Sequence, residues 1–255
     1  MNVGLRDKVV IITGAASGIG AAIAREAAQA GAAGLMLTDQ NVAGLESIAT
    51  ELHAAFVVAD LATPHAPAEI VQATIAHFGM VDGLVNAAGL TTRASLTSGS
   101  TADWDVLFAV NTRAPFFLMQ AVVANMLSRN AAGAIVNILS TNAHCGAPEL
   151  AIYSGSKGAL ATLTKNAANA HMADRIRANG INLGWVATPG EDYMQAEILG
   201  RGVGWLAEEE AKMPLGRFVQ ADDAARLAVF MLSDASAPMT GVLVDLEQKV
   251  MGAPR

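Results

Sequence analysis

A glycine-rich stretch directly after a short apolar run constrains this fold more than any other feature. Residues 13–20 read TGAASGIG, and Val9 to Ile12 before them are all β-branched. This order predicts a buried strand, a tight turn and the start of a helix, because glycine permits left-handed turns and close backbone approach. Such a turn directs backbone amides and the positive helix end at an anion. We therefore expect a phosphate-binding loop formed by Gly14, Ser17, Gly18, Ile19 and Gly20.

The loop alone is weak evidence, since its Gly-x-x-x-Gly-x-Gly spacing differs from the Gly-x-Gly-x-x-Gly fingerprint. A signal peptide is a competing interpretation, because Arg6 and Lys8 precede the apolar run. However, Asp7 separates these basic residues, and the apolar stretch ends at Arg25, short of the about 20 residues that a bilayer span needs. We expect a buried strand and a cytoplasmic protein, which also fits the single cysteine, Cys145.

Runs typical of strands and helices alternate along the chain. The predicted strands are 9–13, 34–38, 54–59, 81–86, 134–140, 181–185 and 242–245. The predicted helices are 19–30, 42–52, 66–78, 101–129 with a kink at Pro115, 151–178 and 222–232. This alternation indicates an α/β fold with a Rossmann-type, doubly wound parallel sheet and helices on both faces. The chain has 255 residues, 53% of them hydrophobic, and no linker or repeat, so we predict one domain over residues 1–255.

Asp39 ends the second predicted strand, about 20 residues after the glycine loop. A carboxylate at this place can accept hydrogen bonds from the ribose hydroxyls of NAD, and it would repel the 2′-phosphate of NADP. No Arg or Lys occurs within the loop or just after Asp39. We therefore predict NAD as the cofactor. The competing interpretation of Asp39 is a solvated loop acid.

Tyr153 and Lys157 share one face at the start of a long predicted helix, because residues four apart lie together. A nearby ammonium stabilises a phenolate, so we expect Lys157 to lower the pKa of Tyr153 and make it a general acid or base. Ser140 closes the fifth predicted strand, at the sheet edge where α/β folds bind ligands. Asn111 lies in the apolar run FAVNTRAPFF, where a buried amide needs partners. Taken singly, Tyr153 and Lys157 could also be two solvent-exposed residues, and Asn111 could also be a structural residue whose side chain bonds to the backbone.

As a set, these motifs resemble the short-chain dehydrogenase/reductase family over nearly the whole chain. The matching features are TGAASGIG, Asp39, the AD ending at Asp60, NAAG at 86–89, Asn111, Ser140, Tyr153 with Lys157, and GWVAT ending at Thr188. The set is specific because order and spacing agree, although each motif alone is weak. The resemblance implies an NAD-preferring oxidoreductase of the Asn-Ser-Tyr-Lys type that transfers a hydride between a secondary alcohol carbon and NAD.

The resemblance also implies a role for each matching residue. Tyr153 would exchange the proton with the substrate oxygen, Ser140 would hold that oxygen, and Lys157 would bind the nicotinamide ribose and lower the Tyr153 pKa. Asn111 would anchor a water that leads from Lys157 to solvent. Further cofactor contacts would come from Asp60 and Leu61 at the adenine, from Asn86, Ala87 and Gly89 beneath the adenosine ribose, and from Val186 and Thr188 at the carboxamide end.

Three positions depart from the family pattern. Ala87 stands where the family usually has a second Asn, and Leu183 stands where it usually has Pro. Asp245-Leu246-Glu247 replaces the usual Asp-Gly-Gly near the C-terminus. None of these positions belongs to the catalytic four, but the last one bears on C-terminal contacts that matter for assembly and substrate choice.

Specificity is expected from two variable segments, STNAHCGAPEL from Ser140 onward and residues 190–213, the second typical of a mobile lid. The candidate substrate-binding residues are Arg93, Asn142, His144, Glu149, Trp185 and Glu191. Because unpaired buried polar groups are costly, this polarity favours a small sugar or polyol oxidised at a secondary carbon. The alternatives are an apolar pocket near Trp185, Met194 and Trp205, a carrier-linked ketoacyl reductase, and a non-enzymatic nucleotide sensor on the same fold.

Predicted helices 101–129 and 151–178 carry apolar or small residues around most of their circumference, which indicates burial on more than one side. A second subunit would cover the outer side, and the family resemblance implies a homotetramer with these helices paired. The formal net charge of −7 and the lack of a basic block argue against nucleic-acid and anionic-membrane partners. We expect a small-molecule substrate and no metal.

Overall fold

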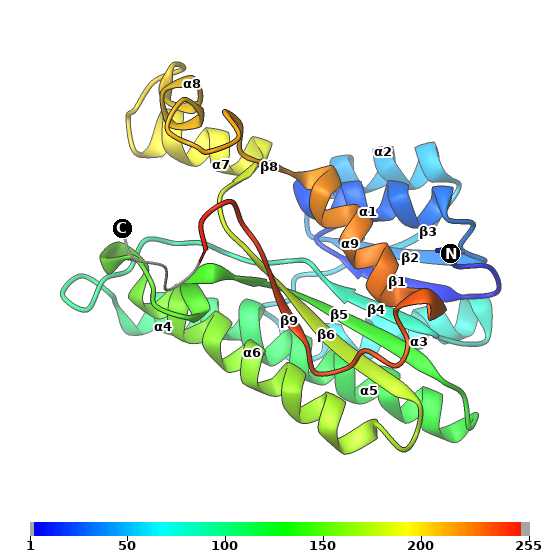
Figure 1. Cartoon of the computed structure of the whole chain (residues 1–255). Coiled ribbons are helices and arrows are strands. Elements are labelled where there is room, and N and C mark those ends of the chain that lie inside the picture. Colours follow the sequence, from blue (N-terminus) through cyan, green and yellow to red (C-terminus); the bar gives the residue numbers. More distant parts are fainter. Residues whose placement is uncertain (1–2, 251–255) are drawn as a thin grey trace.

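Seven parallel strands form one sheet in the order β3-β2-β1-β4-β5-β6-β9 in the computed structural model, which describes residues 3–250 (Figure 1). The strands are β1 (Val9–Thr13), β2 (Gly34–Asp39), β3 (Ala55–Val58), β4 (Gly83–Asn86), β5 (Gly133–Ser140), β6 (Ile176–Leu183) and β9 (Leu243–Leu246). The strand order reverses between β1 and β4, and doubly wound sheets bind ligands at the carboxyl ends of the strands at such a point. The predicted Rossmann-type fold class is confirmed.

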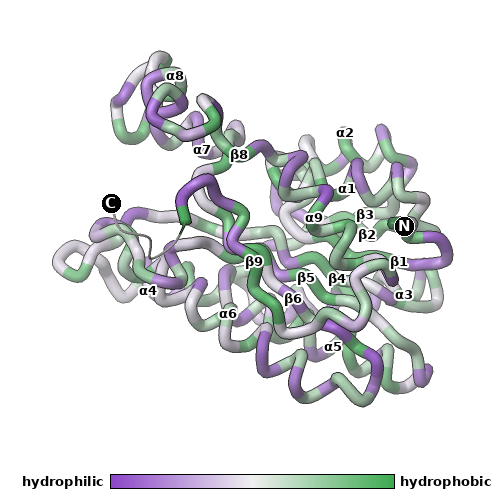
Figure 2. The backbone as a smooth tube through the Cα atoms, viewed as in Figure 1, coloured by the Kyte–Doolittle hydropathy of each residue, from purple (hydrophilic) through white to green (hydrophobic). Residues whose placement is uncertain are grey.

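Helices cover both faces of this sheet. The longer ones are α1 (Gly18–Gln29), α2 (Val42–Leu52), α3 (Ala66–Phe78), α4 (Thr101–Phe108), α5 (Ala114–Ser128), α6 (Ala151–His171) and α9 (Ala221–Leu232). Helices α1, α2 and α9 pack on one face, and α3, α5 and α6 pack on the other. Side-chain alternation along β1 explains the two cores, since Val10 and Ile12 face the first and Ile11 faces the second. The central strands accordingly consist mostly of hydrophobic residues (Figure 2).

Helix α6, which carries Tyr153, is shorter than predicted. It ends at His171 rather than at residue 178, and β6 begins at Ile176 rather than at residue 181. Between them the chain turns through Arg175, whose φ of 62° is left-handed. β6 pairs with β5 from Ile176 opposite Gly133 onward. The prediction was wrong because this backbone pairing overrides a local composition that also suits a helix.

The long helix predicted for residues 101–129 is interrupted by a π-helical turn, η1 (Ala109–Arg113). The interruption lies just before Pro115 rather than at it. Because Pro115 has no N–H, the α-helical hydrogen bond to the carbonyl of Asn111 cannot form. By length and composition, Thr101–Ser128 could cross a membrane, but 56% of its most apolar window is buried within the protein. Its apolar side chains, Leu118 and Val122 among them, belong to the core beneath the sheet.

Between β7 (Val186–Ala187) and β8 (Val219–Gln220) the chain leaves the main sheet and forms the segment at the top of Figure 1. This β7–β8 segment, residues 188–218, holds α7 (Pro189–Tyr193), η4 (Met194–Ile198) and α8 (Trp205–Glu210). Trp185 stacks on Phe218 with ring centroids 5.0 Å apart, and Trp205 lies 5.8 Å from Trp185. Trp205 and Phe218 are fully buried, so the segment has a small aromatic core of its own.

Candidate active site

The loop between β1 and α1 requires glycine at three positions. Gly14 and Gly18 have left-handed φ values of 69° and 53°. A Cβ at Gly20 would lie 2.1 Å from the carbonyl oxygen of Gly14, so the turn closes only around glycine. Ser17 is the N-cap of α1 but makes no side-chain cap hydrogen bond, which leaves the first helical amides for an anion.

Asp39, at the end of β2, lies beside this loop. Its Oδ2 accepts a hydrogen bond from the Ala16 amide at 3.1 Å, and its Oδ1 accepts one from the Asn41 amide at 2.9 Å. Each carboxylate oxygen keeps a second lone pair that a ribose hydroxyl could use. The carboxylate is therefore held against the glycine loop by backbone amides rather than projecting into bulk solvent.

The NAAG stretch after β4 packs on the same loop. Thr13 Oγ1 accepts hydrogen bonds from the amides of Ala87 and Ala88 at 3.1 and 3.0 Å. A Cβ on Gly14 would approach the Ala88 backbone to 2.8 Å. The Asn86 side chain donates to Asn137 inside the sheet at 2.8 Å and is 1% exposed. The stretch therefore presents its backbone, rather than the Asn86 amide, to the sheet edge.

Thr188 faces the glycine loop from the other side of the edge. A Cβ at Gly18 would lie 3.4 Å from Thr188 Cγ2. Gly89 is similarly close to the catalytic residues, since a Cβ there would lie 3.3 Å from Lys157 Nζ. The glycine loop, Asp39, the NAAG stretch and Thr188 thus meet along one edge, with glycine where the loop approaches Ala88 and Thr188. This arrangement fits a dinucleotide.

Three further predicted cofactor residues make contacts within the protein. Asp60 is exposed, and its Oδ1 accepts a hydrogen bond from the Ala62 amide at 2.8 Å, which fixes the turn after β3. Leu61 and Val186 are buried in the two cores. These two residues therefore support the sheet edge through packing.

Tyr153 and Lys157 lie on one buried face of α6, as predicted from their spacing. Lys157 Nζ donates to the carbonyl of Ile138 at 2.8 Å and lies 6.0 Å from the centroid of the Tyr153 ring. Burial lowers the pKa of Lys157 to about 8, because desolvation disfavours the ammonium. The site therefore holds a lysine that can lose its proton near neutral pH.

The pKa of Tyr153 is raised, so the expected lowering by Lys157 is not found. Burial is the main cause; the Ser140 hydroxyl lowers this pKa, the Glu191 charge raises it and the Arg93 charge lowers it. The expectation was wrong because the Lys157 ammonium is directed at the carbonyl of Ile138. Tyr153 is a protonated phenol here, the form in which it can donate to a substrate oxygen.

Ser140, the last residue of β5, is oriented by Asn142. Ser140 Oγ accepts hydrogen bonds from the Asn142 amide at 3.1 Å and from Asn142 Nδ2 at 3.3 Å. Asn142 Oδ1 accepts one from the Ala147 amide at 2.9 Å. With both acceptor positions filled, the single hydroxyl hydrogen of Ser140 is left to donate toward Tyr153. Asn142, predicted as a substrate contact, is engaged with Ser140 and the Ala147 amide in this structure.

Asn111 is fully buried in η1 and joins three elements. Its Oδ1 accepts from the Leu90 amide, and its Nδ2 donates to the Leu90 carbonyl, both at 2.9 Å. Nδ2 also donates to Ser156 Oγ at 3.0 Å, and Ser156 donates to the Tyr153 carbonyl at 2.7 Å. Because the side chain of Asn111 is engaged, a water held by Asn111 would have to bind its backbone carbonyl. This carbonyl lacks its α-helical donor, because Pro115 has no N–H.

Three predicted substrate residues come together above the catalytic group. Glu191 Oε1 accepts hydrogen bonds from Trp185 Nε1 at 2.9 Å and from Gln195 Nε2 at 2.7 Å. Arg93 Nη2 pairs with the same oxygen at 3.5 Å. The Arg93 and Glu191 side chains are only 22% and 16% exposed. The structure thus builds a largely buried ion pair where the sequence showed only scattered polar residues.

His144 and Glu149 do not join this cluster. His144 Nε2 lies 2.9 Å from Asp245 Oδ1 in β9, to which Asn182 also donates at 2.7 Å. Glu149 is exposed, and its backbone carbonyl accepts from the Ala94 amide at 2.8 Å. His144 is therefore engaged with Asp245, and the substrate-binding role of both residues stays a prediction. Within residues 3–250, no group of three or more His, Cys, Asp or Glu could hold a metal ion.

The indoles of the predicted apolar alternative have polar partners. Trp185 Nε1 donates to Glu191, and Trp205 Nε1 donates to Asp192 Oδ1 at 2.8 Å. Trp205 is 1% exposed, so it packs inside the β7–β8 segment rather than lining an open pocket. The area around Trp185 therefore combines an aromatic surface with an ion pair.

The departures from the family pattern have simple structural consequences. Ala87 bonds to Thr13 through its backbone amide, which does not depend on its side chain. Leu183 is a core residue, 4% exposed. Glu247 packs over Gly184, where a Cβ would lie 1.5 Å from Glu247 Oε2. The altered C-terminus therefore brings an acidic side chain to the end of β6, next to Trp185.

Sequence reasoning missed three residues of the site: Thr13, Ser156 and Gln195. Thr13 opens the glycine stretch and Ser156 directly precedes Lys157, so their positions were the available signal. Gln195 is 4% exposed and holds Glu191, but no sequence pattern marks it.

Comparison with known proteins agrees with this geometry. Residues 14–246 match the family model described as "Enoyl-(Acyl carrier protein) reductase". The chain is 34% identical to gluconate 5-dehydrogenase of Gluconobacter oxydans, over 91% of this chain and 90% of that protein. It is 35% identical to D-threitol dehydrogenase of Mycolicibacterium smegmatis, over 93% of this chain and 90% of that protein. The solved structure of L-sorbose reductase from Gluconobacter frateurii, complexed with NADPH and L-sorbose, has a TM-score of 0.91 at 27% identity and 100% coverage of both chains.

The family match covers the glycine loop, Asn111, Ser140 and the Tyr153–Lys157 pair. The relatives and the solved structure extend the likeness over almost the entire chain. From its sheet order, its buried Tyr–Lys pair and these matches, the chain belongs to the short-chain dehydrogenase/reductase family of oxidoreductases.

Proposed function

We propose that this protein is an NAD-dependent dehydrogenase that oxidises a secondary alcohol carbon of a small sugar or polyol. The observation that carries the proposal is that Ser140, Tyr153 and Lys157 lie together beside the sheet edge formed by the glycine loop, the NAAG stretch and Thr188. A buried lysine with a lowered pKa is costly to keep. This cost supports catalysis over the non-enzymatic sensor, which needs no such pair.

Each catalytic side chain then has a separate task. Ser140 donates its hydroxyl hydrogen to the substrate oxygen. In the oxidation Tyr153 accepts the alcohol proton, so it first has to lose its own proton, and the positive charge of bound NAD would favour its phenolate. Lys157 binds the nicotinamide ribose, and a water on the Asn111 carbonyl connects Lys157 with solvent. The chemistry that NAD supplies when bound is acceptance of the hydride at its nicotinamide.

NAD is favoured over NADP by the position of Asp39. Its carboxylate stands at the outer end of the glycine loop, and residues 13–20 and 40–45 contain no Arg or Lys to neutralise a 2′-phosphate. The L-sorbose reductase structure contains NADPH, so likeness to it does not favour NAD. The proposal therefore depends on this chain's own carboxylate.

A sugar or polyol is supported by the polar side chains near Tyr153 and by the relatives. Arg93 and Glu191 act electrostatically on Tyr153, so both charged groups lie within electrostatic range of its phenol. D-threitol dehydrogenase and gluconate 5-dehydrogenase are named for polyhydroxylated substrates. We further propose that residues 190–213 act as a lid over this substrate, since they leave the sheet at the site and carry Glu191.

A carrier-linked acyl reductase is the second candidate, and the description of the matching family model favours it. Such an enzyme should prefer NADPH and show basic residues at the cleft mouth. Arg93 is a cation that acts on Tyr153, but it is paired with Glu191. Asp39 also argues against this candidate.

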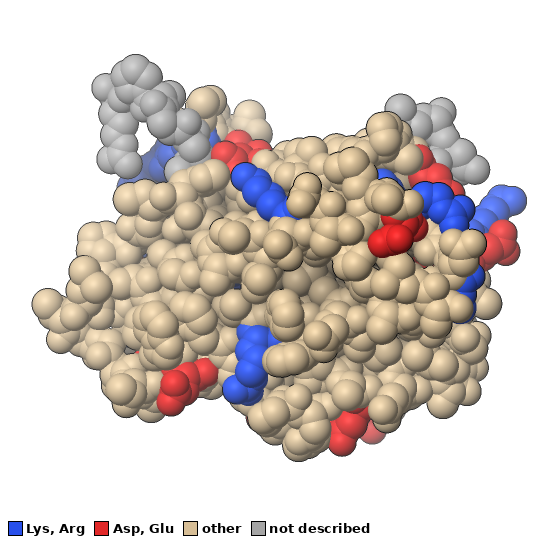
Figure 3. All heavy atoms as spheres, turned by 90° about the horizontal axis from the view of Figure 1, so that it is seen from below, with Lys and Arg blue, Asp and Glu red and all other residues tan. Residues whose placement is uncertain are grey.

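We also propose that the protein is a cytoplasmic homotetramer in which α5 and α6 pair with their counterparts. A groove of about 330 Å³ runs between these helices, lined in part by Phe116, Met119 and Leu163. Phe116, Phe117 and Leu127 are 39–45% exposed. The face seen from below, where α5 and α6 lie, carries few charged side chains (Figure 3). A monomer in light scattering at micromolar concentration would contradict this assembly.

The function is tested by following NADH absorbance with purified protein and a panel of sugars, polyols, apolar secondary alcohols and ketoacyl thioesters. We expect the highest kcat/KM for a sugar or polyol with NAD. Tyr153→Phe should reduce turnover by about 10²–10⁴-fold while NAD still binds. A clear preference for an apolar alcohol, or for a thioester with NADPH, would overturn the substrate class.

A further inference from the structure

We propose that Arg93 and Glu191 form a two-sided subsite that binds two hydroxyl groups of an uncharged polyol or sugar and discriminates against sugar acids. The inference rests on the proposed function and further specifies that the preferred substrate is uncharged. The relatives do not decide this point, because gluconate is an acid whereas threitol and sorbose are neutral.

The position of the pair beside the reacting centre comes from backbone contacts. Arg93 precedes Ala94, whose amide donates to the Glu149 carbonyl at 2.8 Å and whose carbonyl accepts from the Ile152 amide at 3.3 Å. The loop bearing Arg93 is thus attached to the residue directly before Tyr153. Glu191 lies in the first turn of α7, and its amide donates to Thr188 Oγ1 at 3.2 Å. Arg93 and Glu191 therefore approach Tyr153 from two different segments.

Both side chains are held, yet both keep unused hydrogen-bonding atoms. Arg93 Nη1 donates to the Thr91 carbonyl at 2.9 Å, and Nη2 pairs with Glu191 at 3.5 Å. Arg93 Nε makes no hydrogen bond within residues 3–250. Glu191 Oε1 has three partners, whereas Oε2 has none among the described residues. The subsite therefore offers a donor from Arg93 and an acceptor from Glu191.

This combination matches hydroxyl groups in particular. A hydroxyl can accept from Arg93, and a second hydroxyl can donate to Glu191 Oε2. A carboxylate placed in this subsite can only accept, so it could bond to Arg93 but would be repelled by Glu191 and would leave Oε2 without a donor. Because the ion pair is mostly shielded from solvent, that repulsion is weakly screened. A site built to bond a hydroxyl group at this place disfavours an analogue that carries a carboxylate there instead.

The test compares polyols with sugar acids of the same carbon skeleton, such as sorbitol with gluconate and threitol with threonate. We expect the wild-type protein to favour the polyol by at least ~10-fold in kcat/KM, the cost of one unfavourable charge contact. Glu191→Gln keeps an acceptor for Trp185 and Gln195 but removes the charge. It should shift the acid-to-polyol ratio toward the acid by at least ~10-fold. Arg93→Met should raise KM for polyols and bring no gain for acids.

Glu46→Gln is the matched control, because Glu46 is an exposed acid of α2, outside the proposed lid. It should leave the ratio unchanged. Thermal unfolding and NADH fluorescence of each variant separate a folding defect from a change in specificity. Preference of the wild-type protein for the acid, or an unchanged ratio in Glu191→Gln, overturns the subsite while leaving the dehydrogenase in place. Oxidation of apolar alcohols with no turnover of either skeleton series overturns the proposed substrate class and the subsite together.

Discussion

Asn142 fixes the direction in which Ser140 donates its hydrogen bond. Two donors of Asn142, its amide and its Nδ2, occupy the acceptor positions of Ser140 Oγ at 3.1 and 3.3 Å. The hydroxyl hydrogen is left for the substrate oxygen or Tyr153. Asn142 is thus a positioning residue, two places after the residue that it orients.

Asn142→Ala should lower kcat by about 10-fold with little change in KM for NAD, which corresponds to loss of one hydrogen bond. Asn142→Asp separates this role from loop structure. The aspartate keeps an acceptor for the Ala147 amide but, instead of donating, would draw the Ser140 hydrogen toward itself. Steady-state kinetics with the preferred alcohol should show kcat lowered in both variants. A normal kcat in Asn142→Asp would show that only the loop matters.

Asp39→Asn should broaden cofactor use. The amide keeps an acceptor for the Ala16 amide, so the glycine loop retains its geometry, while the charge that opposes a 2′-phosphate is gone. We expect kcat/KM for NADP to rise by ~10-fold or more relative to NAD, measured with one fixed alcohol. Asp39→Ala should additionally weaken NAD binding. Equal use of NAD and NADP by the wild-type protein would contradict the assignment of Asp39.

Lys157→Met should abolish turnover yet stabilise the fold at pH 7. The drop of the Lys157 pKa from the ordinary 10.5 to about 8 means that burying the ammonium costs the folded protein about 3 kcal/mol. Lys157→Met removes this cost but also loses the hydrogen bond to the Ile138 carbonyl, which is worth about 1 kcal/mol. Between pH 8 and 10.5 the unfolded lysine binds a proton that the folded one has released, so the wild-type protein gains stability as pH rises.

Urea unfolding of Lys157→Met and the wild-type protein should therefore show an advantage of about 2 kcal/mol for the variant at pH 7 that shrinks toward pH 10.5. Lys165→Met, an exposed lysine on the same helix, is the control and should show no such trend. A constant difference across this pH range would contradict a desolvated Lys157.

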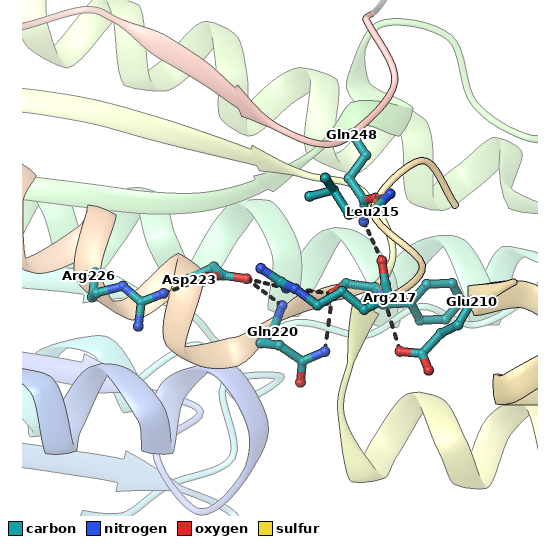
Figure 4. Close-up of polar contacts among 8 residues, drawn as sticks. Glu210, Leu215, Arg217, Gln220, Asp223, Arg226 and Gln248 are labelled. Atoms are coloured by element: carbon teal, nitrogen blue, oxygen red, sulfur yellow. Dashed lines mark hydrogen bonds and ion pairs between the residues drawn. The ribbon is translucent and has the colours of Figure 1, made fainter. Parts of the chain in front are cut away.

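Gln248→Ala should loosen the returning end of the β7–β8 segment. Gln248 Oε1 accepts from the Leu215 amide at 2.9 Å, and its Nε2 donates to the Arg217 carbonyl (Figure 4). Arg217 in turn pairs with Asp223 of α9 at 2.8 Å. Since Gln248 joins the C-terminal strand region to this segment, its loss should raise KM for the alcohol several-fold and leave KM for NAD unchanged. Lys249→Ala, an exposed neighbour, is the control.

Limited proteolysis gives a second measurement of the same contact. Cleavage within residues 199–217 should be faster in Gln248→Ala than in Lys249→Ala, because backbone anchoring limits local opening. Equal cleavage rates would show that Arg217–Asp223 and the aromatic core hold the segment without Gln248.

Local sequence determined the elements that depend on near neighbours. The glycine loop follows from steric needs of a strand-to-helix turn, and Tyr153 and Lys157 meet because they are one helical turn apart. The alternation of strands and helices was sufficient to predict the sheet class. The end of α6 could not be predicted in this way, because pairing with β5 decided where β6 begins.

Only tertiary structure decided the partners of the polar side chains. Arg93 and Glu191 are 98 residues apart and meet across two segments, while His144 is drawn to Asp245, 101 residues away. The same structure directs Lys157 at the Ile138 carbonyl and raises the pKa of Tyr153. Composition identifies these groups as polar, but their hydrogen bonds and desolvation depend on distances that exist only after the chain has folded. The sequence by itself therefore determined the fold class and the positions of the catalytic side chains, and the folded chain decided their hydrogen bonds, their charges and the shape of the substrate site.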